Sequence, residues 1–162
     1  MKAKYKAALA IVCSFALGAA VVMCSTTAFA QGTAAEAKAM LEKAVTAVKA
    51  DKAKALDMFN TGEGGFLDRD LYVFCSDVSD GKVLAVGNPN AKQLIGTDGR
   101  VLKDSTGKAY GQELFAAGQK PEGQISEVSY LFSKPGPDKT PVPKVSLVTR
   151  VGAIYCGVGY YK

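Results

Sequence analysis

The most informative absence in this sequence is histidine, which does not occur among its 162 residues. Without an imidazole, neither a Ser-His-Asp nor a Cys-His arrangement is available, and the commonest general base of enzymes is excluded. Zinc and haem sites lose their commonest ligand, and no Cys-x-x-Cys motif is present. A carboxylate pair at Asp68 and Asp70 could transfer protons, but this spacing beside Arg69 is more typical of a solvated strand end. We therefore expect no catalytic residue, no metal site and no cofactor, and we predict that the protein is not an enzyme.

The chain opens with a segment typical of a secretory signal peptide, to which we assign residues 1–30. Its three basic residues are Lys2, Lys4 and Lys6. An apolar run over 7–23 follows, and small residues at Ala28 and Ala30 then form an Ala-x-Ala cleavage pattern. We predict cleavage after Ala30, which makes Gln31 the new N-terminus.

Two other interpretations of this segment fit less well. An uncleaved membrane anchor needs about 20 apolar residues, and the run is slightly short for that. A lipoprotein signal at Cys24 requires a small residue where Met23 stands. We therefore predict a periplasmic protein whose mature part, residues 31–162, forms one domain large enough to bury its own core.

Positive charge is scarce once the signal is removed. Three of the 20 basic residues and none of the 15 acidic residues lie in the signal, so only about +2 of the formal net charge of +5 remains. No polybasic patch is left, and the remaining basic residues alternate with acidic ones. We expect no nucleic-acid partner.

Of the four cysteines, Cys13 and Cys24 leave with the signal, and Cys75 and Cys156 remain. An even pair in an exported protein favours a disulfide. Such a bridge would contribute roughly 4 kcal/mol in the chain-entropy description. The alternative is two buried free thiols that pack as small apolar side chains.

The segment 33–60 has the composition of a helix, since it is rich in Ala, Lys, Glu and Leu and contains neither Gly nor Pro. Thr33 and Glu36 form a capping-box pattern at its start. Apolar residues recur at helical spacing, and the glycines of 62–65 end the pattern. We expect one long helix of about 27 residues, about 40 Å in length.

Beyond residue 66 the pattern changes to short β-rich segments separated by turn residues. We predict strands over 71–76, 82–86, 124–133, 144–151 and 153–161, a loop over 91–108, and a short helix over 109–119. Hairpin connections dominate, so we expect an antiparallel sheet with helices on one face. The fold class is therefore α+β, with the long N-terminal helix within 31–61 and the sheet with its insert over 66–162.

Seven short motifs stand in the order and spacing of one known family. They are FLDRDLYVF at 66–74, DGKVLA at 80–85, NP at 88–89, LIG at 94–96, DSTGK at 104–108, PVPKVS at 141–146 and CGVGYY at 156–161. In these the mature chain resembles the single Cache domain, a PAS-like extracytoplasmic sensor domain of bacteria. The resemblance implies a sheet of five antiparallel strands with a ligand pocket between sheet and insert.

The resemblance also implies that the first and last strands are central neighbours, which would bring Cys75 and Cys156 within disulfide reach. Family members commonly bind small organic molecules, often short carboxylates, and signal to a kinase or chemotaxis module. Two positions depart from the family pattern. Leu147 replaces an aromatic residue of the fourth strand, and Val86 with Gly87 replaces a histidine near the second strand.

Five residues are our candidates for ligand binding: Arg69, Tyr72, Tyr130, Lys144 and Ser146. Arginine and lysine make charge-assisted hydrogen bonds to anions, while tyrosines supply apolar walls with a polar tip. The alternative for the tyrosines is a place in the core. The alternative for Arg69 is an ion pair with Asp68 or Asp70.

We predict a free-standing periplasmic ligand-binding protein of signal transduction or chemotaxis, without an output module of its own. Its partners would be a small organic ligand, such as a short carboxylate, and a membrane-bound sensor or a second copy of the chain. The alternative is a non-catalytic structural or partner-binding protein whose pocket is filled by its own side chains. Its long helix would then be the dimer or partner interface.

Overall fold

Two helices lead the domain in the computed structural model, which describes residues 30–162. They are α1 (Ala34–Ala50) and α2 (Lys52–Thr61). The predicted capping box is present, because the Thr33 hydroxyl accepts from the Glu36 N–H at 3.2 Å and the Glu36 carboxylate accepts from the Thr33 N–H at 2.8 Å. The predicted signal peptide lies outside the described residues except for Ala30.

The expectation of one long helix is wrong, because the helical segment breaks at Asp51. This residue has φ −158° and ψ 102°, and it ends α1 and caps α2 at once. Its carboxylate accepts a hydrogen bond from the Lys54 N–H at 3.0 Å. Aspartate competes with the helix for backbone N–H groups, so it favours a cap over a helix interior.

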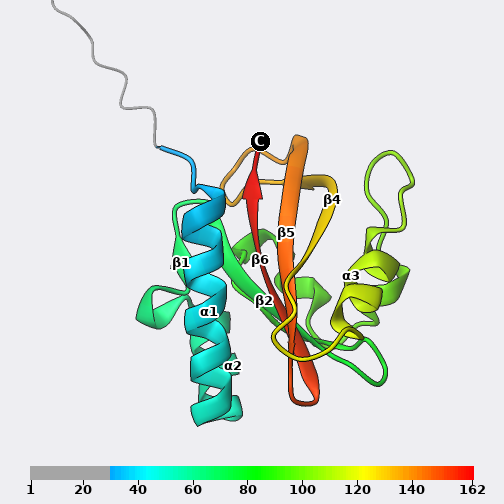
Figure 1. Ribbon diagram of the computed structural model, residues 1–162. Helices are drawn as coiled ribbons and strands as arrows, with labels where there is room; N and C mark the ends of the chain where they lie inside the picture. The colour runs from blue at the N-terminus through cyan, green and yellow to red at the C-terminus, as the bar shows by residue number, and fades with distance from the viewer. Residues whose placement is uncertain (1–29) are drawn as a thin grey trace, which may run out of the picture.

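After the break the chain turns back on itself, and the two helices form a hairpin (Figure 1). Lys43, in the middle of α1, donates a hydrogen bond at 2.5 Å to the carbonyl of Gly64, which follows α2. Gly62 ends α2 with φ 82°, a left-handed conformation that glycine adopts without strain. The short 3-10 turn η1 (Glu63–Gly65) leads into the sheet.

A single antiparallel sheet forms the centre of the domain (Figure 1). Its strands are β1 (Leu67–Asp68), β2 (Leu71–Asp77), β3 (Val83–Val86), β4 (Ser126–Ser133), β5 (Pro141–Val151) and β6 (Ile154–Tyr161). The order is β1-β2-β6-β5-β4, and β3 pairs with β2. The five predicted strands are present, β5 begins earlier than predicted, and the two-residue β1 is additional.

The connection between β3 and β4 carries the insert. It contains two 3-10 helices, η2 (Pro89–Leu94) and η3 (Gly99–Val101), and the helix α3 (Tyr110–Gly118). The helix matches the predicted one closely. The 3-10 helices lie almost entirely where we expected a loop.

Helices cover both faces of the sheet, which corrects the expectation of helices on one face. The α1–α2 hairpin lies against one face, whereas α3 lies on the opposite side (Figure 1). The reason is visible in β2 and β6, where nearly every residue is buried whichever face it points to. A sheet whose two faces are both buried needs cover on both.

The predicted disulfide is present between Cys75 and Cys156, with the two Cα atoms 4.1 Å apart. The two residues face each other directly, because β2 and β6 are neighbours in the sheet. Both side chains are fully buried on the face covered by α1 and α2. The bridge therefore ties the first long strand to the last one inside the core.

Candidate ligand-binding site

A small cavity lies between the sheet and the insert, on the face away from the helical hairpin. It encloses about 50 Å³. The sheet contributes Tyr72, Phe74, Ser76, Tyr130, Phe132 and Tyr155, and the insert contributes Ala91, Leu94, Leu102, Tyr110 and Leu114. One water needs about 10–15 Å³ by this measure, so the space fits a group of roughly three or four non-hydrogen atoms.

Strand alternation aims these side chains at the cavity. Tyr72, Phe74 and Ser76 share one face of β2, as neighbouring residues of a strand point to opposite sides. On β6 the same face carries Gly157 and Gly159. A Cβ at Gly157 would come within 2.3 Å of the Phe74 ring, so the absence of a side chain at Gly157 leaves room for this ring on the sheet.

Lys144 of β5 is buried on this face beside the aromatic residues, with 1% of its surface exposed. Its ammonium group donates to the Tyr72 hydroxyl at 2.5 Å. The ring centroids of Tyr72 and Tyr161 lie 3.9 and 4.9 Å from its Nζ. A Cβ at Gly159 would lie 2.1 Å from the Lys144 Cε, so glycine is required for this placement.

The charge of Lys144 has no acidic partner at close range. No carboxylate of residues 30–162 lies within ion-pair distance of its Nζ. Burial lowers the pKa of Lys144 to about 7, an effect that the more distant Asp70 carboxylate partly opposes. A buried cation that is compensated only by aromatic rings and one hydroxyl is suited to receive an anion.

A second polar pair lies beside Lys144. The hydroxyl groups of Tyr130 and Ser146 are 2.9 Å apart and buried. The Tyr110 ring of α3 stacks on Tyr130 with centroids 4.2 Å apart. Burial raises the pKa of Tyr130 well above its ordinary value, so the phenol keeps its proton and can donate a hydrogen bond at neutral pH.

Contacts at two places hold the insert over the sheet. Lys92 of η2 donates to the carbonyls of Asn60 and Val86. Further along the chain, the Asp104 carboxylate accepts from the Leu131 N–H of β4 at 3.0 Å. Hydrogen bonds from the Thr106 hydroxyl and from this N–H lower the pKa of Asp104 to about 2. The side chains from η2 and α3 are thereby fixed above β2 and β4.

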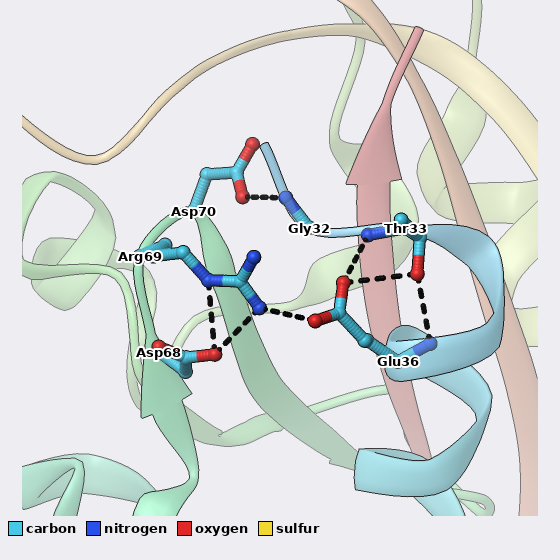
Figure 2. A network of polar contacts seen from close by, with 6 residues as sticks. All are labelled: Gly32, Thr33, Glu36, Asp68, Arg69 and Asp70. Atoms are coloured by element: carbon cyan, nitrogen blue, oxygen red, sulfur yellow. Dashed lines mark hydrogen bonds and ion pairs between the residues drawn. The ribbon is translucent and has the colours of Figure 1, made fainter. Parts of the chain in front are cut away.

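Arg69 does not lie with the other four candidates. Its backbone has φ 56°, which turns the side chain toward α1, and it pairs with Glu36 at 2.7 Å and Asp68 at 2.8 Å (Figure 2). Tyr72 and Tyr130 line the cavity, and Lys144 and Ser146 bond to them. The ligand-binding role of all five stays a prediction.

The neighbouring carboxylates are also separated. Asp68 bonds to the Arg69 guanidinium, whereas Asp70 accepts from the Gly32 N–H at 2.7 Å (Figure 2). The two aspartates thus face different partners. Within residues 30–162 no group of three or more His, Cys, Asp or Glu side chains could hold a metal ion.

The sequence analysis missed several aromatic residues of the site, namely Phe74, Tyr110, Phe132, Tyr155 and Tyr161. Alternation gave a usable signal for Phe132, which stands two positions after Tyr130 on the same strand. For Tyr110 no such signal existed, because its place depends on how α3 lies over the sheet.

Among the described residues 30–162, none of the helices has the length and apolar character that crossing a bilayer requires.

Comparisons with known proteins agree with this architecture. A comparison with curated proteins gave no match. Among solved structures, a methyl-accepting chemotaxis protein from Vibrio parahaemolyticus RIMD 2210633 is 25% identical, with a TM-score of 0.62 over 78% of this chain and 86% of that chain. A periplasmic sensor domain of a chemotaxis protein is 24% identical, with a TM-score of 0.58 over 77% of this chain and 87% of that chain.

A third similar structure is that of a Cache chemosensory domain, described for its recognition of carboxylic acids. It is 20% identical, with a TM-score of 0.62 over 78% of this chain and 91% of that chain. The family model described as "Single Cache domain 2" matches residues 2–159 of the sequence. Since this match spans nearly the whole sequence, the chain belongs to the single Cache domain family.

Proposed function

We propose that this protein is an exported sensory domain that captures a small organic anion in the cavity between sheet and insert. The observation that carries the proposal is Lys144, a buried cation with no carboxylate of residues 30–162 at ion-pair distance. An incoming carboxylate would supply the missing charge through a charge-assisted hydrogen bond. The export signal, with cleavage after Ala30, is part of the same proposal.

The size and lining of the cavity favour a short carboxylate. A volume of about 50 Å³ leaves room for a carboxylate with a very short chain. Tyr72, Tyr130 and Ser146 supply hydroxyl groups, and Phe74 and Phe132 supply apolar walls. The similarity to a domain described by its carboxylic acid recognition supports the same class.

Thermal melts against a panel of short mono- and dicarboxylates, amines and sugars test this proposal. We expect a rise in the melting temperature with at least one short monocarboxylate, as a ligand that binds only the folded state stabilises it. Lys144→Met should weaken that binding by about tenfold or more, in line with loss of a charged hydrogen bond.

The matched control is Lys139→Met, which removes an exposed lysine from the β4–β5 connection. It should bind the carboxylate as the unsubstituted protein does. A panel without any stabilising anion, or equal affinity in the Lys144→Met and unsubstituted proteins, would contradict the proposal.

A second candidate function is favoured by the way the side chains fill the site. The rings of Tyr72, Phe132 and Tyr161 already surround the Lys144 ammonium, and little space remains. This arrangement supports a partner-binding protein whose pocket is closed by its own residues. A melting temperature that depends on protein concentration and on no ligand of the panel would favour this candidate.

A further inference from the structure

Asp70 is a buried carboxylate outside the cavity described above, and only one of its oxygens has a partner. Asp70 follows Arg69, whose backbone is in the left-handed conformation, and it is 8% exposed. Oδ1 accepts a hydrogen bond from the Gly32 N–H at 2.7 Å (Figure 2). Oδ2 is buried and makes no hydrogen bond within residues 30–162. A buried oxygen of a charged group is unfavourable without a hydrogen bond, so a second donor that reaches Oδ2 would stabilise this arrangement.

The cationic side chains around Asp70 are engaged elsewhere. The Arg69 guanidinium bonds to Asp68 and Glu36 and makes no ion pair with Asp70 (Figure 2). Lys134 places its Nζ 5.5 Å from the ring centroid of Tyr161. Lys144 donates to the Tyr72 hydroxyl and acts on Asp70 only from a greater distance. None of these three cations forms an ion pair with Asp70 in the described structure.

Ala30 and Gln31 border the space beside Asp70. A cavity of about 350 Å³ is lined by Ala30, Gln31, Arg69, Asp70, Lys134 and Pro135. Gly32 is buried and packs closely against Leu71, since a Cβ at this position would lie 2.2 Å from the Leu71 Cγ. The N–H of Gly32 is thereby fixed on Oδ1, and the nitrogen of Gln31 lies one residue away, within about 4 Å along the chain.

We propose that Asp70 is the binding site for the α-ammonium group that cleavage after Ala30 creates on Gln31. The inference rests on the proposed cleavage, in which a signal peptidase adds water across the Ala30–Gln31 peptide bond. Ala30 leaves with the carboxylate, and Gln31 keeps the amine. At neutral pH that amine is mostly protonated, since α-amino groups have pKa values of about 7.7–8.0. It can donate a charge-assisted hydrogen bond to Oδ2 while Gly32 stays on Oδ1.

This arrangement has a chemical consequence for an N-terminal glutamine. A free α-amine attacks its own side-chain amide carbon, forms the ring C–N bond and releases ammonia. A protonated amine held on Asp70 lacks the lone pair for that attack. The mature protein is therefore expected to keep Gln31 uncyclised, while removal of the Asp70 charge lets cyclisation proceed.

The experiment uses the full gene product, exported with its own signal and purified from the periplasm. Mass spectrometry of the N-terminal peptide first identifies the cleavage point. The pKa of the α-amine is then measured from the pH dependence of its acetylation. We expect this pKa to lie at least about one unit above the ordinary 7.7–8.0, which leaves about tenfold less free amine at neutral pH.

Asp70→Asn should return the α-amine to its ordinary pKa and speed cyclisation by about tenfold. The matched control Asp68→Asn removes a neighbouring surface carboxylate and should leave the α-amine pKa raised. The unsubstituted protein unfolded in urea should show the ordinary value, which tests the contact even if Asp70→Asn does not fold.

The outcomes separate the two proposals. A chain that begins at another residue overturns the cleavage and this inference together. A chain that begins at Gln31 with an ordinary α-amine pKa, or one already cyclised, overturns this inference alone. Ligand binding is measured independently by the thermal melts, so neither outcome changes that proposal.

Discussion

The two faces of the sheet are equally buried but chemically different. On the face toward α1 and α2, the strands present Val73, Cys75, Cys156 and Val158, which pack as an apolar core around the disulfide. On the face toward the insert, the alternate residues include tyrosines, Lys144 and Ser146. Because neighbouring residues of a strand point to opposite faces, one set of strands carries an apolar face and a face with polar and charged side chains.

Strand β6 displays this division within four residues. Cys156 and Val158 point to the helical hairpin, whereas Gly157 and Gly159 stand opposite Phe74 of β2 and Ser146 of β5. A Cβ at either glycine would clash, with Phe74 in one case and with Lys144 in the other. On the insert face, β6 therefore carries glycines, and the large side chains of the neighbouring strands β2 and β5 fill the space that side chains of β6 would take.

The largest expected effect concerns the helix face. The double substitution Cys75→Ala with Cys156→Ala should lower the free energy of unfolding by about 4 kcal/mol, because it frees a loop of 81 residues in the unfolded chain. Urea denaturation measures this, and reduction of the unsubstituted protein with a thiol is the control. If stability carried by this face is independent of recognition, ligand affinity should not change in the variant at a temperature where it is folded. A loss below about 1 kcal/mol would contradict the assigned role of the bridge.

A matched pair of leucines compares the two faces directly. Leu71 is buried on the helix face, whereas Leu114 borders the cavity. Leu71→Ala should cost about 4 kcal/mol of unfolding free energy and Leu114→Ala about 2 kcal/mol, because a residue beside existing space leaves fewer contacts behind. Only Leu114→Ala should alter ligand selectivity, toward slightly larger carboxylates. Equal losses of stability in denaturant titrations would remove the distinction between the faces.

The smallest effect is a pH dependence confined to the insert face. The pKa of Lys144 falls from its ordinary 10.5 to about 7, so above pH 7 the unfolded state binds more protons than the folded state. Stability should therefore rise between pH 7 and 9, by up to about 1 kcal/mol per pH unit. Below pH 7 the lysine is charged in both states and the contribution of its burial is constantly unfavourable.

Lys144→Met should abolish this rise, and the exposed control Lys139→Met should retain it. The measurement is a series of urea titrations between pH 6 and 9. In the same range, carboxylate affinity should decrease with rising pH, because the neutral amine offers the anion no charge. Equal pH profiles in the unsubstituted protein and Lys144→Met would show that Lys144 is not the buried cation described here.

Local patterns predicted most of the elements of this fold. Composition and caps located the start of α1 at Thr33, the turn glycines located the end of α2, and β-rich segments located five of the strands. The break at Asp51 was missed, because a single aspartate in a segment without Gly or Pro changes helical propensity only slightly. The 3-10 helices of the insert were also missed, because their Pro, Asn and Gly residues are equally typical of a loop.

The candidate site was predictable only in part. Four of the candidates come together because their strands place them on one face: Tyr72, Tyr130, Lys144 and Ser146. The sequence predicts this face, because neighbouring residues of a strand point to opposite sides. Arg69 is separated from them by its left-handed backbone and by Glu36, which lies 33 residues earlier in the chain. Local patterns do not encode such distant partners.

By itself, the sequence determined the order and type of most elements, the cysteine pair, and the two alternating sets of residues on each strand. Those properties follow from local rules of backbone geometry and side-chain spacing. Only the tertiary structure decided that both faces are covered, that Lys144 is enclosed by aromatic rings, and that Asp70 faces Gly32. These depend on which strands become neighbours and on desolvation, and both arise from the packing of residues far apart in the chain.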